Sequence, residues 1–224
     1  MPFIKIRDNH LTYGGVAYFR AHSEDVEPGS IGEKRQPLRK ANYLEVKDRI
    51  PPSKFKVARS TVALIDIGEL SRSDIDAQVT ALIPVGGVPV PTKLDAQAAF
   101  DQLKSQEVKL VKFVVSTADM VRALNGSPDQ RDKLAGWGHD ARVVIENFVA
   151  MHYTLAEKFN HDVEVSLSAG VDHVVQATVG GGGSGAGTTT VTMPKPTCFA
   201  YLLGKIRWNG NVVDDLDDDQ WSFS

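Results

Sequence analysis

The chain of 224 residues has little of what several functional classes require, namely cysteine, long apolar runs and excess positive charge. Its one cysteine, Cys198, allows no disulfide framework and no thiolate metal site within the chain, so we expect a reducing, cytoplasmic location. No apolar run reaches the roughly 18 residues of a transmembrane helix, and the first residues are not typical of a secretory signal. A net charge of −3 argues against general electrostatic binding of nucleic acid.

Catalytic and metal-binding motifs are also missing from the sequence. The six histidines have neither HExxH nor zinc-ligand spacing, and no GxSxG or SxxK nucleophile motif occurs. The glycine-rich stretch 180–187 lacks the Lys-Ser/Thr pair of a phosphate-binding loop and precedes a strand pattern rather than a helix. We therefore predict a non-enzymatic protein with no cofactor and no metal ion, and no small-molecule substrate is evident.

Alternation of apolar and polar residues predicts mainly strands. We expect them at 3–6, 11–22, 42–46, 55–67, 75–83, 108–115, 162–169, 171–179, 188–192 and 198–208. The segment 75–83 also fits a short helix, but its period-two alternation favours a strand. The run at 108–115 is almost wholly apolar, which is typical of a central strand covered on both faces.

Helical spacing predicts helices at 95–107, 117–124 and 140–159, with a further helical turn at 129–134. The longest carries a stripe of apolar residues three or four apart: Val144, Phe148, Met151, Leu155 and Phe159. Because strands and helices do not alternate regularly, the predicted class is α+β, a largely antiparallel or mixed twisted sheet with a helical segment packed on it. We expect one domain over 1–210 with a helical insertion at 117–159, and an acidic tail at 211–224.

Two segments are predicted to be exposed and weakly packed: 23–40 and the glycine stretch 180–187. The first is polar and rich in Gly and Pro, and reads as a long surface loop with a local basic cluster of Lys34, Arg35, Arg39 and Lys40. This cluster is either a solvated loop or a contact for phosphate or anionic lipid headgroups.

Two stretches of the chain resemble a known family, and they occur in the same order along the chain as in that family. The sequence TVTMPK at 190–195 followed by FAYLL at 199–203, and QLKS at 102–105 followed by KFVVST at 112–117, resemble the core of the gasdermin pore-forming domain. The segment 117–159 is an insertion that the family does not predict.

The resemblance implies a homo-oligomer that inserts amphipathic β-hairpins into an anionic membrane. The candidate hairpins are 55–83 and 162–192, because both alternate. Residues expected in the membrane or assembly strands are Val163, Val165, Leu167, Val171, Val175, Val179, Thr190 and Thr192.

Two other functions fit the same features. A structural assembly subunit of the virion or phage-tail type would also lack catalytic motifs and would pair through sheet edges and long loops. A single-stranded-DNA-binding protein would account for the aspartate-rich tail with Trp221 and Phe223. However, the chain lacks a recognisable basic, aromatic-lined groove, so we do not expect nucleic acid as a partner.

Overall fold

The structure is a computed structural model that describes residues 3–7, 9–23, 26–66, 108–152, 163–169, 174–181, 189–194 and 198–222. The first six strands are β1 (Ile4–Ile6), β2 (His10–Tyr13), β3 (Val16–Phe19), β4 (Ser30–Arg35), β5 (Tyr43–Arg49) and β6 (Val57–Asp66). The others are β7 (Val108–Val114), β8 (Ala141–His152), β9 (Val163–Ala169), β10 (Val174–Gly181), β11 (Thr189–Pro194), β12 (Cys198–Asn209) and β13 (Val212–Asp219). The helices are α2 (Thr117–Asn125) and α3 (Pro128–Trp137), with 3₁₀ turns η2 (Pro52–Lys54) and η5 (Gly138–Asp140).

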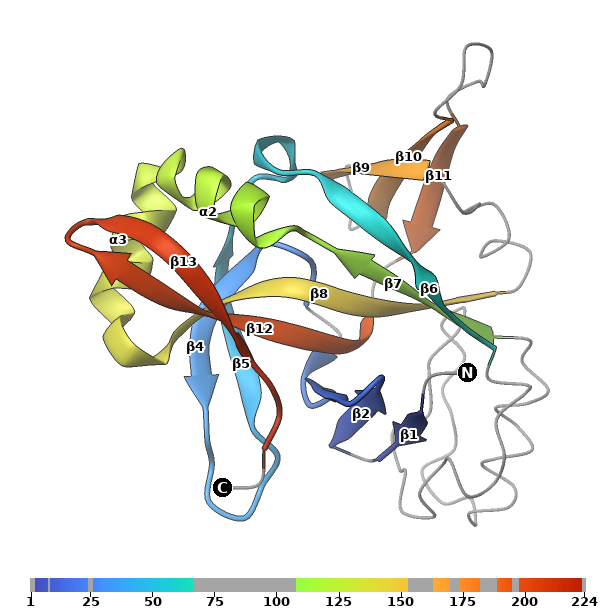
Figure 1. Ribbon diagram of the computed structural model, residues 1–224, viewed down its shortest axis with the longest axis horizontal. Helices are drawn as coiled ribbons and strands as arrows, with labels where there is room; N and C mark the ends of the chain where they lie inside the picture. The colour runs from blue at the N-terminus through green and yellow to red at the C-terminus, as the bar shows by residue number, and fades with distance from the viewer. Residues whose placement is uncertain are drawn as a thin grey trace.

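One sheet organises these strands (Figure 1). Its main path is β1-β2-β3-β12-β8-β7-β6-β9-β10-β11, while β13 pairs with β12, β4 pairs with β8, and β5 pairs with β4. Every strand pair among the described residues is antiparallel. The predicted α+β class is therefore confirmed in its broad form, with a sheet that dominates two short α-helices.

Several elements form where the local sequence predicts them. The predicted helix at 117–124 is α2, and the Ser116 side chain accepts a hydrogen bond from the Asp119 backbone N–H at 3.1 Å, which satisfies one free donor at the helix start. The predicted helical turn at 129–134 lies in α3, which begins at Pro128. The apolar run of β7 does form an interior strand, between β6 and β8.

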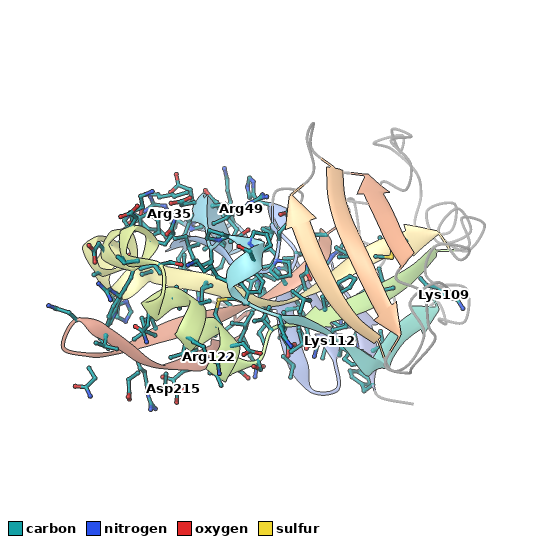
Figure 2. The ribbon with its side chains drawn as sticks, turned by 90° about the horizontal axis from the view of Figure 1, so that it is seen from above. Arg35, Arg49, Lys109, Lys112, Arg122 and Asp215 are labelled. Carbon is teal, nitrogen blue, oxygen red and sulfur yellow. The ribbon has the colours of Figure 1, made fainter. Side chains whose placement is uncertain are left out.

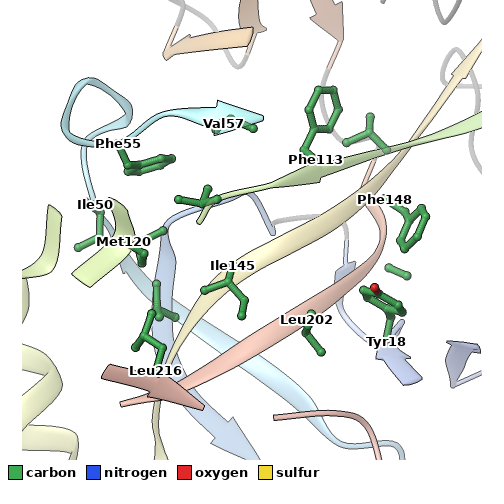
Figure 3. Close-up of a cluster of buried hydrophobic side chains, with 14 of the residues drawn as sticks. Tyr18, Ile50, Phe55, Val57, Phe113, Met120, Ile145, Phe148, Leu202 and Leu216 are labelled. Atoms are coloured by element: carbon green, nitrogen blue, oxygen red, sulfur yellow. The ribbon is translucent and has the colours of Figure 1, made fainter. Parts of the chain in front are cut away.

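Buried side chains form two clusters, with Ile145 of β8 in the larger and Val144 of β8 in the smaller. Figure 3 shows the larger cluster. Phe148 is fully buried and meets Tyr13 and Tyr18 edge-on, with ring centroids 5.4 and 4.9 Å apart. Edge-to-face pairs of this kind add to the stabilisation from burial. Met120 of α2 packs into the same cluster, which fixes the helix against the sheet.

The predicted helix at 140–159 is wrong over 141–152, because these residues form β8. Val144, Phe148 and Met151 are buried as expected, but so are their neighbours Val143 and Ile145. A strand with both faces covered needs no period-two alternation, so its continuous apolar run also matched helical spacing. The β-branched residues of this run favour the strand.

The predicted surface loop at 23–40 is wrong over its middle, because residues 30–35 form β4 between β5 and β8. Ile31 is fully buried against β8. At Gly32, a side-chain Cβ would lie 1.9 Å from the Glu45 carbonyl oxygen, so only glycine allows β5 to approach this closely. The polar residues that suggested a loop are accommodated by ion pairs along the β4–β5 ladder.

The expected acidic tail at 211–224 is also structured, since residues 212–219 form β13 on β12. Val213 and Leu216 are buried among its aspartates, and Trp221 is buried beyond its end. Val213 and Leu216 are three positions apart, and a register shift beside Asp214 allows both to be buried on β12.

Some predictions fall outside the described residues. They include the helix at 95–107, the strand at 75–83, most of the glycine stretch, and Leu155, Phe159 and Val171.

Candidate functional site

The strands β9, β10 and β11 form an antiparallel three-stranded unit with one apolar and one polar face by register. Val165 pairs with Val179, and Leu167 pairs with Ala177, which in turn pairs with Val191. Directly paired residues lie on the same face of a sheet, and successive residues alternate between faces. One face therefore carries an unbroken row of apolar or small residues across all three strands.

The register divides the predicted strand residues between the two faces. Val163, Val165, Leu167, Val175 and Val179 share the apolar face, as the alternation predicted. Thr190 and Thr192 pair with Thr178 and Gln176, so they belong to the polar face. The apolar face is wide because all three strands contribute residues to it.

This three-stranded unit joins the remaining sheet through β6. The pairs are Val57↔Val165 and Ala58↔Glu164, at one end of β9. Figure 2 shows the three strands side by side, running across the direction of β7 and β8. At the other side, β11 pairs with β10 alone within the part of the chain that the structure describes, so it is an edge strand there.

The predicted basic cluster is split by the structure. Lys34 is buried in β4, with its Nζ 2.7 Å from Asp219 and 5.3 Å from the centre of the Phe19 ring. Arg35 is half-buried and pairs with Glu45 and Glu33. Both charges are thus neutralised by the fold.

Arg39 and Lys40 remain exposed, in the β4–β5 connection. Beside them, the Leu38 side chain is 90% exposed. Arg39 has a backbone φ of 60°, which residues other than glycine rarely adopt. The three residues line a cavity of about 670 Å³ that is closed on another side by Asn42 and Trp221. An apolar tip beside two cations is a suitable contact for an anionic surface.

A buried ion-pair triad fastens the end of β13. Asp219 pairs with Lys34 through one carboxylate oxygen, and with Arg142 Nε of β8 at 2.5 Å through the other. The three residues are far apart in the sequence, so sequence reasoning missed this cluster. The apolar pair Val213 and Leu216 inside the acidic run gave no strand signal, because the two residues are three positions apart rather than two.

A second polar cluster lies where β3, β7, β8 and β13 meet. The Tyr18 hydroxyl donates to Glu146 at 2.8 Å, and Lys112 Nζ lies 2.6 Å from the same carboxylate. Burial, followed by the negative charge of Glu146, raises the pKa of Tyr18 far above its ordinary value. Burial and then the charge of Glu146 also raise the pKa of Asp218. A phenol held this strongly in its neutral form is a hydrogen-bond donor rather than a base or nucleophile near neutral pH.

Within the described ranges, no group of three or more His, Cys, Asp or Glu residues is placed to hold a metal ion. A search of the described helices likewise finds none with the length and apolar character to cross a membrane.

Comparison with known proteins gives no match to this chain, whether against protein-family models, curated proteins or solved structures.

Proposed function

We propose that the protein is non-enzymatic and acts by self-association on membranes, with β9–β10–β11 as the unit that inserts into the bilayer. The observation that carries the proposal is the apolar face that the register builds across these strands. A membrane-inserted strand needs apolar residues at alternate positions, and its backbone groups must be paired with neighbouring strands. The unit meets the first requirement, and it meets the second between its own strands, while the outer edges of β9 and β11 would have to pair with neighbouring copies.

The attachment of this unit supports a movement away from the sheet. Its described strand pairs with the rest of the sheet are those at Val57 and Ala58. Few backbone hydrogen bonds would have to be exchanged for it to rotate about this end of β9, while its own pairing could remain intact. Among the described strands β11 is an edge strand, and a neighbouring copy could add a strand there.

The exposed loop carrying Leu38, Arg39 and Lys40 supports a first contact with anionic lipid, before insertion. Figure 1 shows the β4–β5 connection and β9–β11 at opposite ends of the molecule. Both can meet one bilayer only if the strand unit moves, so surface binding and insertion are separate steps in this proposal. Lys34 and Arg35 take no part, because their charges are engaged in ion pairs.

The edge strand also favours a second candidate, a structural assembly subunit. In that case β11 would pair with a neighbouring copy in solution and the apolar face would be covered by protein. The third function expected from sequence required a free acidic tail, whereas Asp219 and Trp221 are buried or half-buried in the fold. We do not propose it further.

Release of an encapsulated dye tests the proposal, with the full chain added to vesicles of anionic or zwitterionic phospholipid. We expect leakage from the anionic vesicles, and its loss in Val179→Lys, because a charge in the middle of the bilayer costs about 2–4 kcal/mol. The matched control is Thr178→Lys, one position away on the polar face. Equal leakage by both variants would contradict insertion of this face.

A labelling experiment separates insertion from misfolding of a variant. With Cys198→Ser as background, single cysteines at Val165 and Ser166 are labelled with an environment-sensitive dye. We expect the dye at 165 to report a lipid environment and the dye at 166 an aqueous one. Absence of both leakage and dye response, together with regular tubes or rings formed without lipid, would reject the pore and favour the assembly subunit.

A further inference from the structure

A second cavity lies at the end of the molecule where α3 meets the turn between β12 and β13. Its volume is about 740 Å³, within the range of small-molecule sites. Figure 1 shows α3 and this turn together, on the opposite side of the molecule from β9–β11. The cavity is therefore separate from the membrane unit proposed above, and the inference goes beyond that function.

Two cations, Lys205 and Arg131, line this cavity beside one carboxylate, that of Asp132. In the register, Lys205 of β12 lies between Arg142 of β8 and Asp217 of β13. The Asp217 carboxylate lies 3.5 Å from the Arg207 guanidinium, with which it forms an ion pair. The charge of Arg142 is balanced by Asp219. Among the described residues, the Lys205 side chain makes neither an ion pair nor a hydrogen bond.

The second cation at the cavity is Arg131 of α3. Its side chain is largely buried, and its carboxylate partner is Asp132 at 3.5 Å, which is itself 75% exposed. Such a long and solvated contact leaves most guanidinium donors available to a ligand. Arg207, on the same strand as Lys205, is different, because three carboxylates within 4 Å surround it. The cavity is thus lined by Lys205, which has no ion pair among the described residues, and by Arg131, which has one long and exposed contact.

An aromatic wall completes the cavity. Trp208 lines it, is half-buried and packs against the main hydrophobic cluster, which holds the indole in place. The buried Ile206 lies beside it. A fixed aromatic surface next to two cations suits a ligand with a planar apolar group and an oxyanion.

We propose that this cavity binds a small organic anion, a carboxylate or phosphate monoester that carries an aromatic or similar planar group. The oxyanion contacts Lys205 and Arg131, and the planar group lies against Trp208. His139 stands at the exposed rim, and the Asp132 carboxylate excludes ligands that place a second negative charge on its side.

The test uses phenyl phosphate as the probe, with the full chain. Benzyl alcohol serves as the neutral analogue and inorganic phosphate as the anion without a ring. Titration calorimetry should show binding of phenyl phosphate that weakens as salt is added, weaker binding of inorganic phosphate, and none of benzyl alcohol. In nuclear magnetic resonance spectra, the Trp208 indole signal should move, while that of Trp221, in the distant Asn42 cavity, should not.

Charge variants decide whether the site is the one proposed. Lys205→Gln and Arg131→Gln should each weaken phenyl phosphate binding at least about tenfold, because each removes one charge-assisted contact. The matched control is Arg122→Gln, which removes an exposed cation of α2 outside the cavity and should leave the affinity unchanged. Thermal unfolding of the free variants checks that each is folded.

Three results would each overturn the inference. They are equal affinity in Lys205→Gln and Arg122→Gln, equal binding of benzyl alcohol and phenyl phosphate, and an unmoved Trp208 signal at saturating phenyl phosphate. None of them depends on dye release, so this inference and the membrane proposal stand or fall separately.

Discussion

Asp219 joins the C-terminal strand to two cations that come from distant parts of the chain. Lys34 and Arg142 expose 7% and 5% of their side chains, and their contacts with the carboxylate are 2.7 and 2.5 Å long. Replacing Asp219 with asparagine keeps the shape of the side chain and removes its charge. Both cations would then be buried without the carboxylate that neutralises them.

The magnitude follows from these distances. At an effective dielectric constant of about 20, each ion pair contributes about 6 kcal/mol of Coulomb attraction. Desolvation of three charges, at several kcal/mol for each ion, offsets much of this attraction. Removing one partner leaves that desolvation cost in place, so breaking a buried pair costs about 3–5 kcal/mol. In a chain of this size, a loss of that amount lowers the melting temperature by on the order of 10 °C.

Thermal and urea unfolding of Asp219→Asn test this value. The matched control is Asp217→Asn on the same strand, because the Asp217 carboxylate is 52% exposed and lies 3.5 Å from Arg207. We expect the control to change the free energy of unfolding by less than about 1 kcal/mol. Equal effects of the two substitutions would refute the view that the triad fastens β13.

Three further predictions concern the core, the sheet and the dependence of stability on pH. Phe148→Ala should reduce the free energy of unfolding by about 3–5 kcal/mol in urea titrations, because the fully buried ring leaves a cavity; a loss below 1 kcal/mol would place the ring outside the core. Gly32→Ala should lower the melting temperature, since its Cβ would overlap the backbone of β5, and an unchanged melting temperature would contradict that approach. The pKa of Asp218 is raised in the folded state, so the stability that its protonated form contributes is lost as pH rises through this folded-state pKa. Asp218→Asn should therefore be more stable than the original chain at pH 7. The variant should lose this advantage below 3.8, the pKa of Asp218 in the unfolded chain. The pKa of Asp48 is lowered because hydrogen bonds, first that from Lys133, outweigh its burial, so Asp48→Asn should lose stability above pH 3.8 and match the original chain once pH falls below the folded-state pKa. Parallel pH profiles for these two variants, measured by urea unfolding, would contradict both assignments.

Local sequence was sufficient wherever an element depends on its own residues. The helix α2 was predicted from the helical spacing of its apolar residues, and the interior position of β7 from its apolar run. The alternation of β9 and β10 likewise predicted which of their residues share a face. In each case, the spacing of apolar residues indicates which side chains the element would have to bury in any fold.

Local sequence was insufficient where the partner decides the conformation. β8 has helical spacing in its apolar residues, but a strand with β4, β7 and β12 as neighbours buries both faces. β4 has the composition of a loop, and becomes a strand because Gly32 admits β5 and because acidic residues neutralise Lys34 and Arg35.

The candidate sites follow the same division. The amphipathic face of β9–β11 was predictable, because alternation along a strand is a local property. The sequence did not predict which cations form ion pairs and which stay exposed. Lys34 and Arg35 belong to one basic cluster in the sequence with Arg39 and Lys40, yet only the last two stay exposed. Likewise, the register places Asp217 opposite Lys205, but the Asp217 carboxylate forms its ion pair with Arg207. Charge balance depends on which strands become neighbours, and that is decided by the tertiary structure, since Coulomb interactions act between residues that are close in space however far apart they are in the chain.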